Sequence, residues 1–397
     1  MTLCFGRQHS AGTPRRPRQI PGLILTSTLV VLSIAPQAEG KSRSAPNPIV
    51  GYGCSDAVLH AKNQELFFMG FDLGFHKTLK DKSNSHILAV EKVSNGSLLG
   101  ATASANQLAQ KGVRLLVGYP SSHEALLAAE VAKRQGLLAI FAGAAHSRLA
   151  SFGPNVYTTG ESMDYEAERL AEFLKSKFSS QHGLLISTPY AVFSKDLDEA
   201  LRSALKKTKY SNLRLSRVHL EKDGRLPAAD LSSLQKKKIS FVLLTTYADE
   251  SLAVLEQFEQ AGIDLPIVAN ASWTTADIEL IRRFLTNRKA PSYMASLWLE
   301  GSPDSSEFEG EVRARYGRPA TQEMAYGYDL GVIVGRIING ANGRNDREAL
   351  IASFKRTHCY EGLASGPLCF EANGGHAKRK ISFVQFTKNG LKPLRGD

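Results

Sequence analysis

The sequence lacks the features of membrane-spanning and metal-binding chains. It has only four cysteines in 397 residues, and Cys54, Cys359 and Cys369 show none of the spacings of zinc ligands. A single apolar run stands out, Leu23–Ile34, and it is short of the roughly 20 residues that a membrane-spanning helix needs. We therefore expect no metal site, and no transmembrane segment after this run.

Local signatures of common enzymes are also absent. Gly70-x-x-x-Gly74 lies within a helical pattern and is not followed by the Lys-Ser/Thr of a Walker loop. Gly51-Tyr52-Gly53 follows a strand pattern without the third glycine of a dinucleotide-binding turn, and no Gly-x-Ser-x-Gly or His-Glu-x-x-His occurs. We predict that the protein is not an enzyme and has no cofactor. Catalytic groups brought together from distant segments would escape this test, so an exported enzyme remains an alternative.

The composition is that of a globular protein with a basic excess. About 43% of the residues are hydrophobic and 22% are charged, and the formal net charge is +11. This charge could favour an anionic ligand, an acidic partner or a membrane surface. The basic residues do not alternate with aromatic ones in a stacking pattern, so no nucleic-acid partner is indicated. The length suits two lobes of roughly 150 to 200 residues each.

The N-terminus has the pattern of a secretion signal. A basic stretch at residues 15–18 precedes the apolar run Leu23–Ile34, and Ala38-Glu39-Gly40 fits the small-x-small cleavage rule. We predict a signal peptide over residues 1–40 and a periplasmic or extracellular location; an uncleaved anchor is the alternative. Cys359 and Cys369 flank a glycine-containing segment, and they could form a disulfide across a hairpin in an oxidising compartment.

Strand and helix patterns alternate through most of the remaining chain. Strands are expected at residues 49–53, 86–91, 113–117, 138–141, 183–187, 213–218, 241–245, 266–269 and 292–297. Helices are expected at residues 64–80, 98–110, 123–134, 165–177, 195–207, 249–261 and 275–285. This alternation predicts an α/β fold with right-handed crossovers and parallel sheets. Ligands of such sheets bind beyond the carboxyl ends of the strands.

The C-terminal part departs from this alternation. Two helices are expected in succession, at Met324–Asn339 and Asp346–Arg356. They are followed by a β segment at Leu368–Phe370 and a last strand at Ile381–Thr387. A tail of this kind is free to return and complete an earlier lobe.

Three turns after expected strands carry residues suited to ligand binding. Ser121 or Ser122 can cap the helix that follows, where free amides attract a carboxylate. The small residues of segment 141–147 would let a ligand approach the backbone, and Tyr247 could cover a ligand. Each feature also has a purely structural interpretation: an ordinary cap, a tight turn and a packed ring.

Several segments, in this order and spacing, resemble those of the type I periplasmic binding proteins of the leucine-binding, branched-chain amino-acid transport group. The resemblance covers about residues 47–392. It is carried by Gly112–Gly118 with the serine pair, Gln135–Ile140 with the small-residue turn, Gln260–Ile263, Ala325–Asp329, Arg347–Leu350 and Tyr360–Phe370.

The resemblance implies two Rossmann-like lobes with parallel central sheets and a cleft between them. The first lobe would comprise residues 45–159 plus 291–370, and the second residues 160–290 plus 371–397. It further implies a monomer that captures a small organic ligand (amino-acid-like, amide or carboxylate) and delivers it to an ABC permease in the membrane. A ligand-sensing receptor of the same fold is the alternative, since a fold does not fix a function.

The resemblance also assigns ligand contacts. The implied contacts are Ser121, Ser122, Gly143, Ala144, Ala145, Phe193, Tyr247 and Asn270. Ala145 stands where the family usually has threonine. The family's acid for the ligand ammonium should fall near Asn270, where this chain has none. Because a buried ammonium needs a counter-charge, either the ligand lacks an amino group or Asp249 or Glu161 substitutes.

Overall fold

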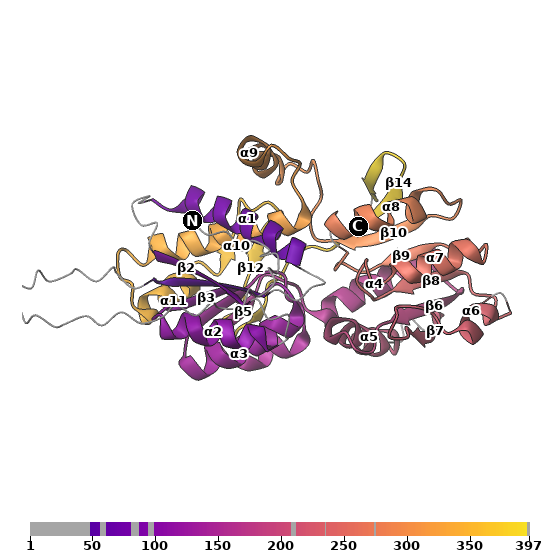
Figure 1. Cartoon of the computed structure of the whole chain (residues 1–397), viewed down its shortest axis with the longest axis horizontal. Coiled ribbons are helices and arrows are strands. Elements are labelled where there is room, and N and C mark those ends of the chain that lie inside the picture. Colours follow the sequence, from indigo (N-terminus) through magenta and orange to yellow (C-terminus); the bar gives the residue numbers. More distant parts are fainter. Residues whose placement is uncertain are drawn as a thin grey trace, which may run out of the picture. The chain divides into compact units, whose positions relative to one another are not determined.

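The computed structural model of the protein describes residues 48–55, 61–80, 87–93, 99–207, 212–234, 236–273 and 275–394. The expected leader, residues 1–40, lies outside this part of the chain. Strands and helices alternate and form two large sheets, which confirms the α/β prediction (Figure 1).

The first sheet has six strands in the order β13-β5-β4-β3-β1-β2. Their bounds are Val50–Ser55 for β1, Leu88–Val93 for β2, Leu115–Gly118 for β3, Leu138–Phe141 for β4, Val156–Thr158 for β5 and Gly375–His376 for β13. All of these strands pair in parallel. Every residue of β3 and β4 is buried, which explains their unbroken apolar sequences.

The second sheet has seven strands in the order β15-β14-β10-β9-β8-β6-β7. Their bounds are His182–Ser187 for β6, Arg214–His219 for β7, Phe241–Leu244 for β8, Ile267–Ala269 for β9, Ser292–Ser296 for β10, Ser382–Thr387 for β14 and Gly390–Pro393 for β15. Strands β6 to β10 pair in parallel, whereas β14 runs antiparallel to both β10 and β15. The sequence missed the short strands β5, β13 and β15.

Helices cover both faces of the first sheet. They are α1 (Ala61–Thr78), α2 (Gly100–Gln110), α3 (Ser122–Gln135), α10 (Gln322–Gly340) and α11 (Arg347–Arg356). Apolar side chains of α2 and α3 pack with Leu116 and Phe141 on one face. On the other face, the Tyr52 ring lies 4.9 Å from the ring of Phe71 of α1.

Helices α1 and α10 pack through glycines. A Cβ atom added to Gly70 would lie 1.9 Å from the Met324 carbonyl oxygen, and one added to Gly327 would lie 1.9 Å from the Phe67 oxygen. Gly74, one turn further along α1, makes a similar approach. The Gly70-x-x-x-Gly74 pattern is therefore a groove for a neighbouring helix.

The second sheet is also covered on both faces. Its helices are α4 (Met163–Phe178), α5 (Val192–Leu205), α6 (Ala228–Ser233), α7 (Leu252–Gln260) and α8 (Thr275–Thr286). Side chains of α7 and α8, among them Phe258 and Ile281, pack with Leu244 in one core. On the opposite face Phe178 of α4 stacks on Phe241 of β8, with ring centroids 4.4 Å apart. Alternate residues of each strand thus serve the two faces.

The remaining elements lie between or beside the sheets. Helix α9 (Ser306–Tyr316) precedes α10, and a 3₁₀ helix, η2 (Ser147–Phe152), follows β4. Strands β11 (Cys359–Tyr360) and β12 (Leu368–Cys369) form a small antiparallel pair. A disulfide joins Cys359 and Cys369 across this pair.

The lobe boundaries stay a prediction, but the strand pairing places two segments in the opposite sheet. Strand β10, which the expected boundary at residue 291 put in the first lobe, pairs with β9 and β14 of the second sheet. Strand β13 was expected in the second lobe, yet it pairs with β5 of the first. Residues 47–397 form one compact unit.

Candidate ligand-binding cavity

A cavity of about 90 Å³ lies beyond the carboxyl ends of strands from both sheets. Its wall includes Ser122, which follows β3, and Glu161, which follows β5. From the second sheet, Tyr247 follows β8 and Leu297 follows β10. This is the position at which open parallel sheets bind ligands.

Most of the predicted ligand contacts line this cavity. They are Ser121, Ser122, Gly143, Ala145, Phe193 and Tyr247. Ala144 and Asn270 do not line it. The Ala144 oxygen accepts a hydrogen bond from Thr158 Oγ1, and Asn270 Nδ2 donates to the oxygens of Leu244 and Thr246. That the six lining residues bind a ligand stays a prediction.

The wall also contains residues that the sequence did not single out. They are Gln64, Phe67, Pro120, Ala271, Ser272, Leu297, Gln322 and Tyr326. Most belong to α1, α10 or strand ends whose local sequence shows only ordinary amphipathic patterns. Only the tertiary structure brings them to one place.

A strained turn positions the serines. Tyr119 has a φ of 48°, in the left-handed region that non-glycine residues rarely adopt. Its buried hydroxyl lies 2.7 Å from Ser104 Oγ, which helps to hold this conformation. Ser121 then caps α3, its Oγ accepting a hydrogen bond from Glu124 N at 3.3 Å. The first turn of α3, with the positive end of its dipole, is thereby fixed at the cavity.

The turn after β4 contains a glycine, Gly143, that lies close to the Tyr326 ring. Gly143 has a φ of 72° and donates from its backbone nitrogen to Thr159 Oγ1 at 2.9 Å. A Cβ atom at this position would lie 3.2 Å from the Tyr326 ring. Glycine therefore permits both the left-handed backbone and the close approach of the ring.

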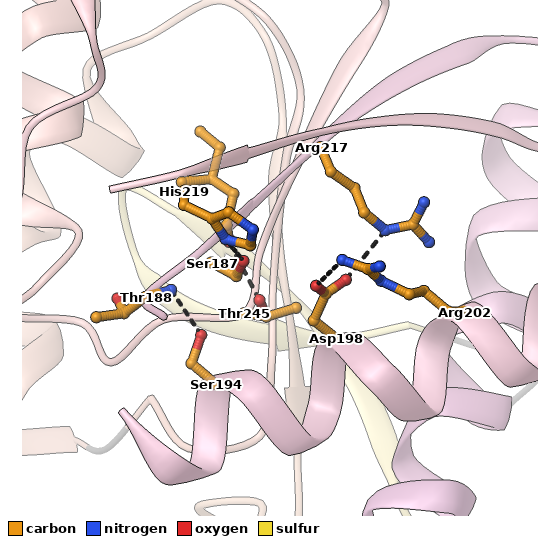
Figure 2. A network of polar contacts seen from close by, with 9 residues as sticks. Ser187, Thr188, Ser194, Asp198, Arg202, Arg217, His219 and Thr245 are labelled. Carbon is orange, nitrogen blue, oxygen red and sulfur yellow. Dashed lines mark hydrogen bonds and ion pairs between the residues drawn. The ribbon is translucent and has the colours of Figure 1, made fainter. Parts of the chain in front are cut away.

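Two aromatic rings form the wall on the side of the second sheet. Phe193 and Tyr247 stack with ring centroids 5.3 Å apart. Figure 2 shows Ser194, next to Phe193, accepting a hydrogen bond from the backbone nitrogen of Thr188 at 2.8 Å. Glu250 Oε2 accepts hydrogen bonds from Thr188 Oγ1 and from the Tyr247 nitrogen, both at 3.0 Å. These bonds tie both rings to the end of β6.

Three oxygen atoms in the wall are buried and have no hydrogen-bond partner. They belong to Glu161 (Oε2), Tyr326 (Oη) and Ser272 (Oγ). Glu161 is 3% exposed and Tyr326 is 5% exposed. Burial raises the pKa of Glu161, and the charge of Arg379 opposes this shift. Within the protein these three atoms of the wall are therefore available for hydrogen bonds.

Arg379 and Glu166 contact residues of the cavity wall but do not line the cavity themselves. Arg379 donates to the oxygens of Thr159 at 3.0 Å and Leu297 at 3.2 Å, and its guanidinium lies 4.9 Å from the Tyr326 ring centre. Glu166 accepts a hydrogen bond from the Ala271 nitrogen at 2.7 Å. Burial, with the nearby charge of Glu161, raises the pKa of Glu166 to about 8.

A polar network at β6 and β7 contains the residue types of a hydrolase but not their arrangement. Ser187 Oγ lies 2.8 Å from His219 Nδ1 (Figure 2). The carboxylate of this network, Asp198, is bound by Arg202 at 2.9 Å and Arg217 at 3.0 Å instead of orienting the histidine. In the part of the chain that the structure describes, no group of three or more His, Cys, Asp or Glu side chains could hold a metal ion.

Comparison with known proteins identifies the family. A family model for periplasmic binding proteins matches residues 95–391. The chain belongs to this family. No curated protein matches this periplasmic binding protein. Among the helices that the structure describes, none is long and apolar enough to cross a membrane.

Solved structures with the same fold are numerous. A leucine binding protein from Thermotoga maritima has a TM-score of 0.75 and 14% identity, with 87% of this chain and 97% of that chain covered. A branched-chain amino acid transporter substrate binding protein from Streptococcus pneumoniae, solved with isoleucine, has a TM-score of 0.71 and 16% identity over 88% and 99% of the two chains. An ABC transporter solute binding protein from R. palustris, solved with benzoate, has a TM-score of 0.73 and 14% identity over 87% and 94%.

Proposed function

We propose that this periplasmic binding protein captures a small organic molecule in the cavity and delivers it to an ABC importer. The observation that carries the proposal is a cavity that residues from both sheets enclose and that contains unpaired buried oxygens. A ligand held there contacts both lobes at once. It therefore stabilises the arrangement in which they close around it, the state that a membrane permease can distinguish from the empty one.

The family and its structures support this proposal. The structures solved with isoleucine and with benzoate show that one fold accommodates ligands of different chemistry. We further propose that residues 1–40 direct export and are cleaved, so that the protein acts outside the cytoplasm as a monomer with a membrane permease as its partner.

Binding can be tested on the purified protein with a thermal-shift screen of amino acids, amines, amides and carboxylates. A ligand at 100 times its Kd stabilises the folded state by about 2.7 kcal/mol, which raises the melting temperature. Tyr247→Ala removes a ring from the cavity wall and should abolish the shift. Tyr190→Ala is the matched control, because Tyr190 is 60% exposed and does not line the cavity.

Transport can be tested by uptake of the labelled ligand into cells that carry or lack the gene. The proposal predicts uptake that depends on the gene and is not restored by the Tyr247→Ala protein. Tight binding without any effect on uptake would refute the transport role and favour a ligand-sensing receptor. A screen in which the wild-type protein and the Tyr190→Ala control respond to no compound would refute the binding role itself.

A further inference from the structure

Among the residues that the structure describes, Glu161 is the one acidic residue in the cavity wall, and none of the lining residues is basic. It lies in the segment that leads from β5 to α4 and is almost fully buried. Its Oε2 atom has no hydrogen-bond partner. A buried carboxylate oxygen without a partner is costly, so a donor that pairs with Oε2 would be favoured.

The nearby arginine does not fill this role. Arg379 directs its Nη atoms to the carbonyl oxygens of Thr159 and Leu297, and it does not line the cavity. Two further carboxyl groups, those of Glu166 and Glu323, lie near Tyr326 of the wall. Together with Glu161 they raise the pKa of its hydroxyl. Carboxyl groups therefore gather on the polar side of the cavity, and Arg379 is the cation that acts on Glu161.

The rest of the wall suits an apolar body with a positive group. Phe67 and Tyr326 have ring centroids 6.1 Å apart, and Phe193 and Tyr247 stack at 5.3 Å. Aromatic faces attract cations as well as apolar groups. An anionic ligand would instead meet Glu161, and no basic side chain of the described wall residues would offset its charge.

The position after β9 cannot supply the missing counter-charge. Asn270, at that position, is buried and carries no charge. Its side-chain amide is hydrogen-bonded to backbone groups: Nδ2 donates to two carbonyl oxygens, and Oδ1 accepts from the Ser272 nitrogen at 2.6 Å. Asp249, the other candidate, does not line the cavity. Of the two substitutes considered from the sequence, only Glu161 lies in the wall.

We propose that the ligand is a protonated organic amine with an apolar or aromatic body, and that Glu161 binds its nitrogen. This inference rests on the proposed function, since it names the class of solute that the cavity captures. A carboxylate on the ligand is compatible with the first turn of α3 but is not required. The amine is the group that decides selection.

The test compares matched compounds on the full chain by calorimetric titration. The aliphatic set is 3-methylbutylamine, leucine, 4-methylpentanoate and 3-methylbutan-1-ol; the aromatic set is benzylamine, phenylglycine, benzoate and benzyl alcohol. In at least one set, the amine-bearing members should bind at least about 10-fold more tightly than the members without nitrogen, the range expected for one charged hydrogen bond.

Glu161→Gln keeps the shape of the side chain and removes its charge. It should weaken amine binding by about 10- to 100-fold and leave the alcohols unchanged. The variant should fold, since it removes a buried charge, and its melting temperature verifies this. Asp329→Asn is the matched control: Asp329 is a buried carboxylate of α10 outside the cavity wall, and amine affinity should stay within about 3-fold of the wild type.

The pH dependence of binding separates a direct contact from a structural role. Burial raises the pKa of Glu161, and an amine binds its ionised form, so amine affinity should increase from pH 5 to pH 8. The charged and titratable groups around it are Arg379, Glu166, Glu323 and Tyr326. Glu161→Gln should remove most of the increase, although Glu166 still titrates in this range.

The outcomes distinguish the two proposals. Preference for amines that Glu161→Gln abolishes supports the inference. Binding of carboxylates or alcohols with no preference for amines would overturn it and leave the proposed capture of a solute intact. A wild-type protein that binds no compound of either set, and none in the broader screen, would overturn both.

Discussion

Replacement of Gly327 by alanine should destabilise the protein through the contact between α1 and α10. The added Cβ atom would lie 1.9 Å from the Phe67 carbonyl oxygen, where carbon and oxygen normally stay at least about 3 Å apart. Because the obstacle is backbone, no side-chain rotation relieves it. The two helices must separate and lose close packing along their length.

The magnitude follows from two opposing terms. Alanine in place of a helical glycine favours folding by about 1 kcal/mol. Overpacking of a close-packed interior typically costs about 1–3 kcal/mol, and more where the backbone must move. Since the overlap is more than 1 Å against backbone, we expect a net loss of about 2 kcal/mol or more in the free energy of unfolding.

Urea unfolding of Gly327→Ala beside Gly310→Ala measures this effect. Gly310 lies in α9, and a Cβ atom there would meet nothing within 4 Å, so alanine should stabilise by up to about 1 kcal/mol. The expected result is opposite signs for the two variants. Gly327→Ala should also shift the adjacent residue, Tyr326, which lines the cavity. Ligand affinity should therefore fall as well. A Gly327→Ala protein as stable as the wild type would refute the close helix contact.

Three further predictions concern stability. Glu166 keeps its proton in the folded state up to about pH 8, whereas the unfolded chain loses it near pH 4.5, so stability present below pH 4.5 should be lost as the pH rises to about 8. This loss amounts to about 5 kcal/mol at most, and thermal unfolding of Glu166→Gln across this range should show a shallower slope. Replacement of Cys359 and Cys369 by serine opens a short loop and should cost about 2–3 kcal/mol in urea unfolding; the same loss in wild type treated with a reductant would confirm the cause, and no loss would contradict it. Ser121→Ala should cost about 1 kcal/mol through the lost cap of α3, whereas an unchanged urea midpoint would show that the cap is dispensable.

Local sequence predicted the long elements well. The helix patterns near α3, α4 and α10 and the apolar runs of β4 and β8 appear in the structure within a few residues of their expected bounds. The helices each bury a continuous face, so their period is visible in the sequence. Strands β4 and β8 are buried at every residue and appear instead as unbroken apolar runs. Helix α9 was missed because it is strongly polar and buries only Phe308 and Val312.

The missed strands and the two segments in the opposite sheet have another cause. Strands β5 and β13 have three and two residues, which is too few for a period to appear. Sheet membership was missed for a different reason. Strand β10 has an ordinary strand sequence, but a local sequence does not determine which strands pair with it, here β9 and β14. Partners in a sheet are chosen over long sequence distances.

The cavity shows the same division between local and tertiary information. The sequence predicted Ser121, Ser122, Gly143 and Tyr247 as wall residues, because each lies in a turn directly after a predicted strand. In a parallel sheet such turns lie at the carboxyl edge, where ligands bind. By itself, the sequence determined the alternating parallel architecture, the family resemblance and these turns. Only the tertiary structure decided that Glu161, from a segment with no binding motif, has an unpaired oxygen in the cavity wall, because burial and missing partners depend on how distant segments pack.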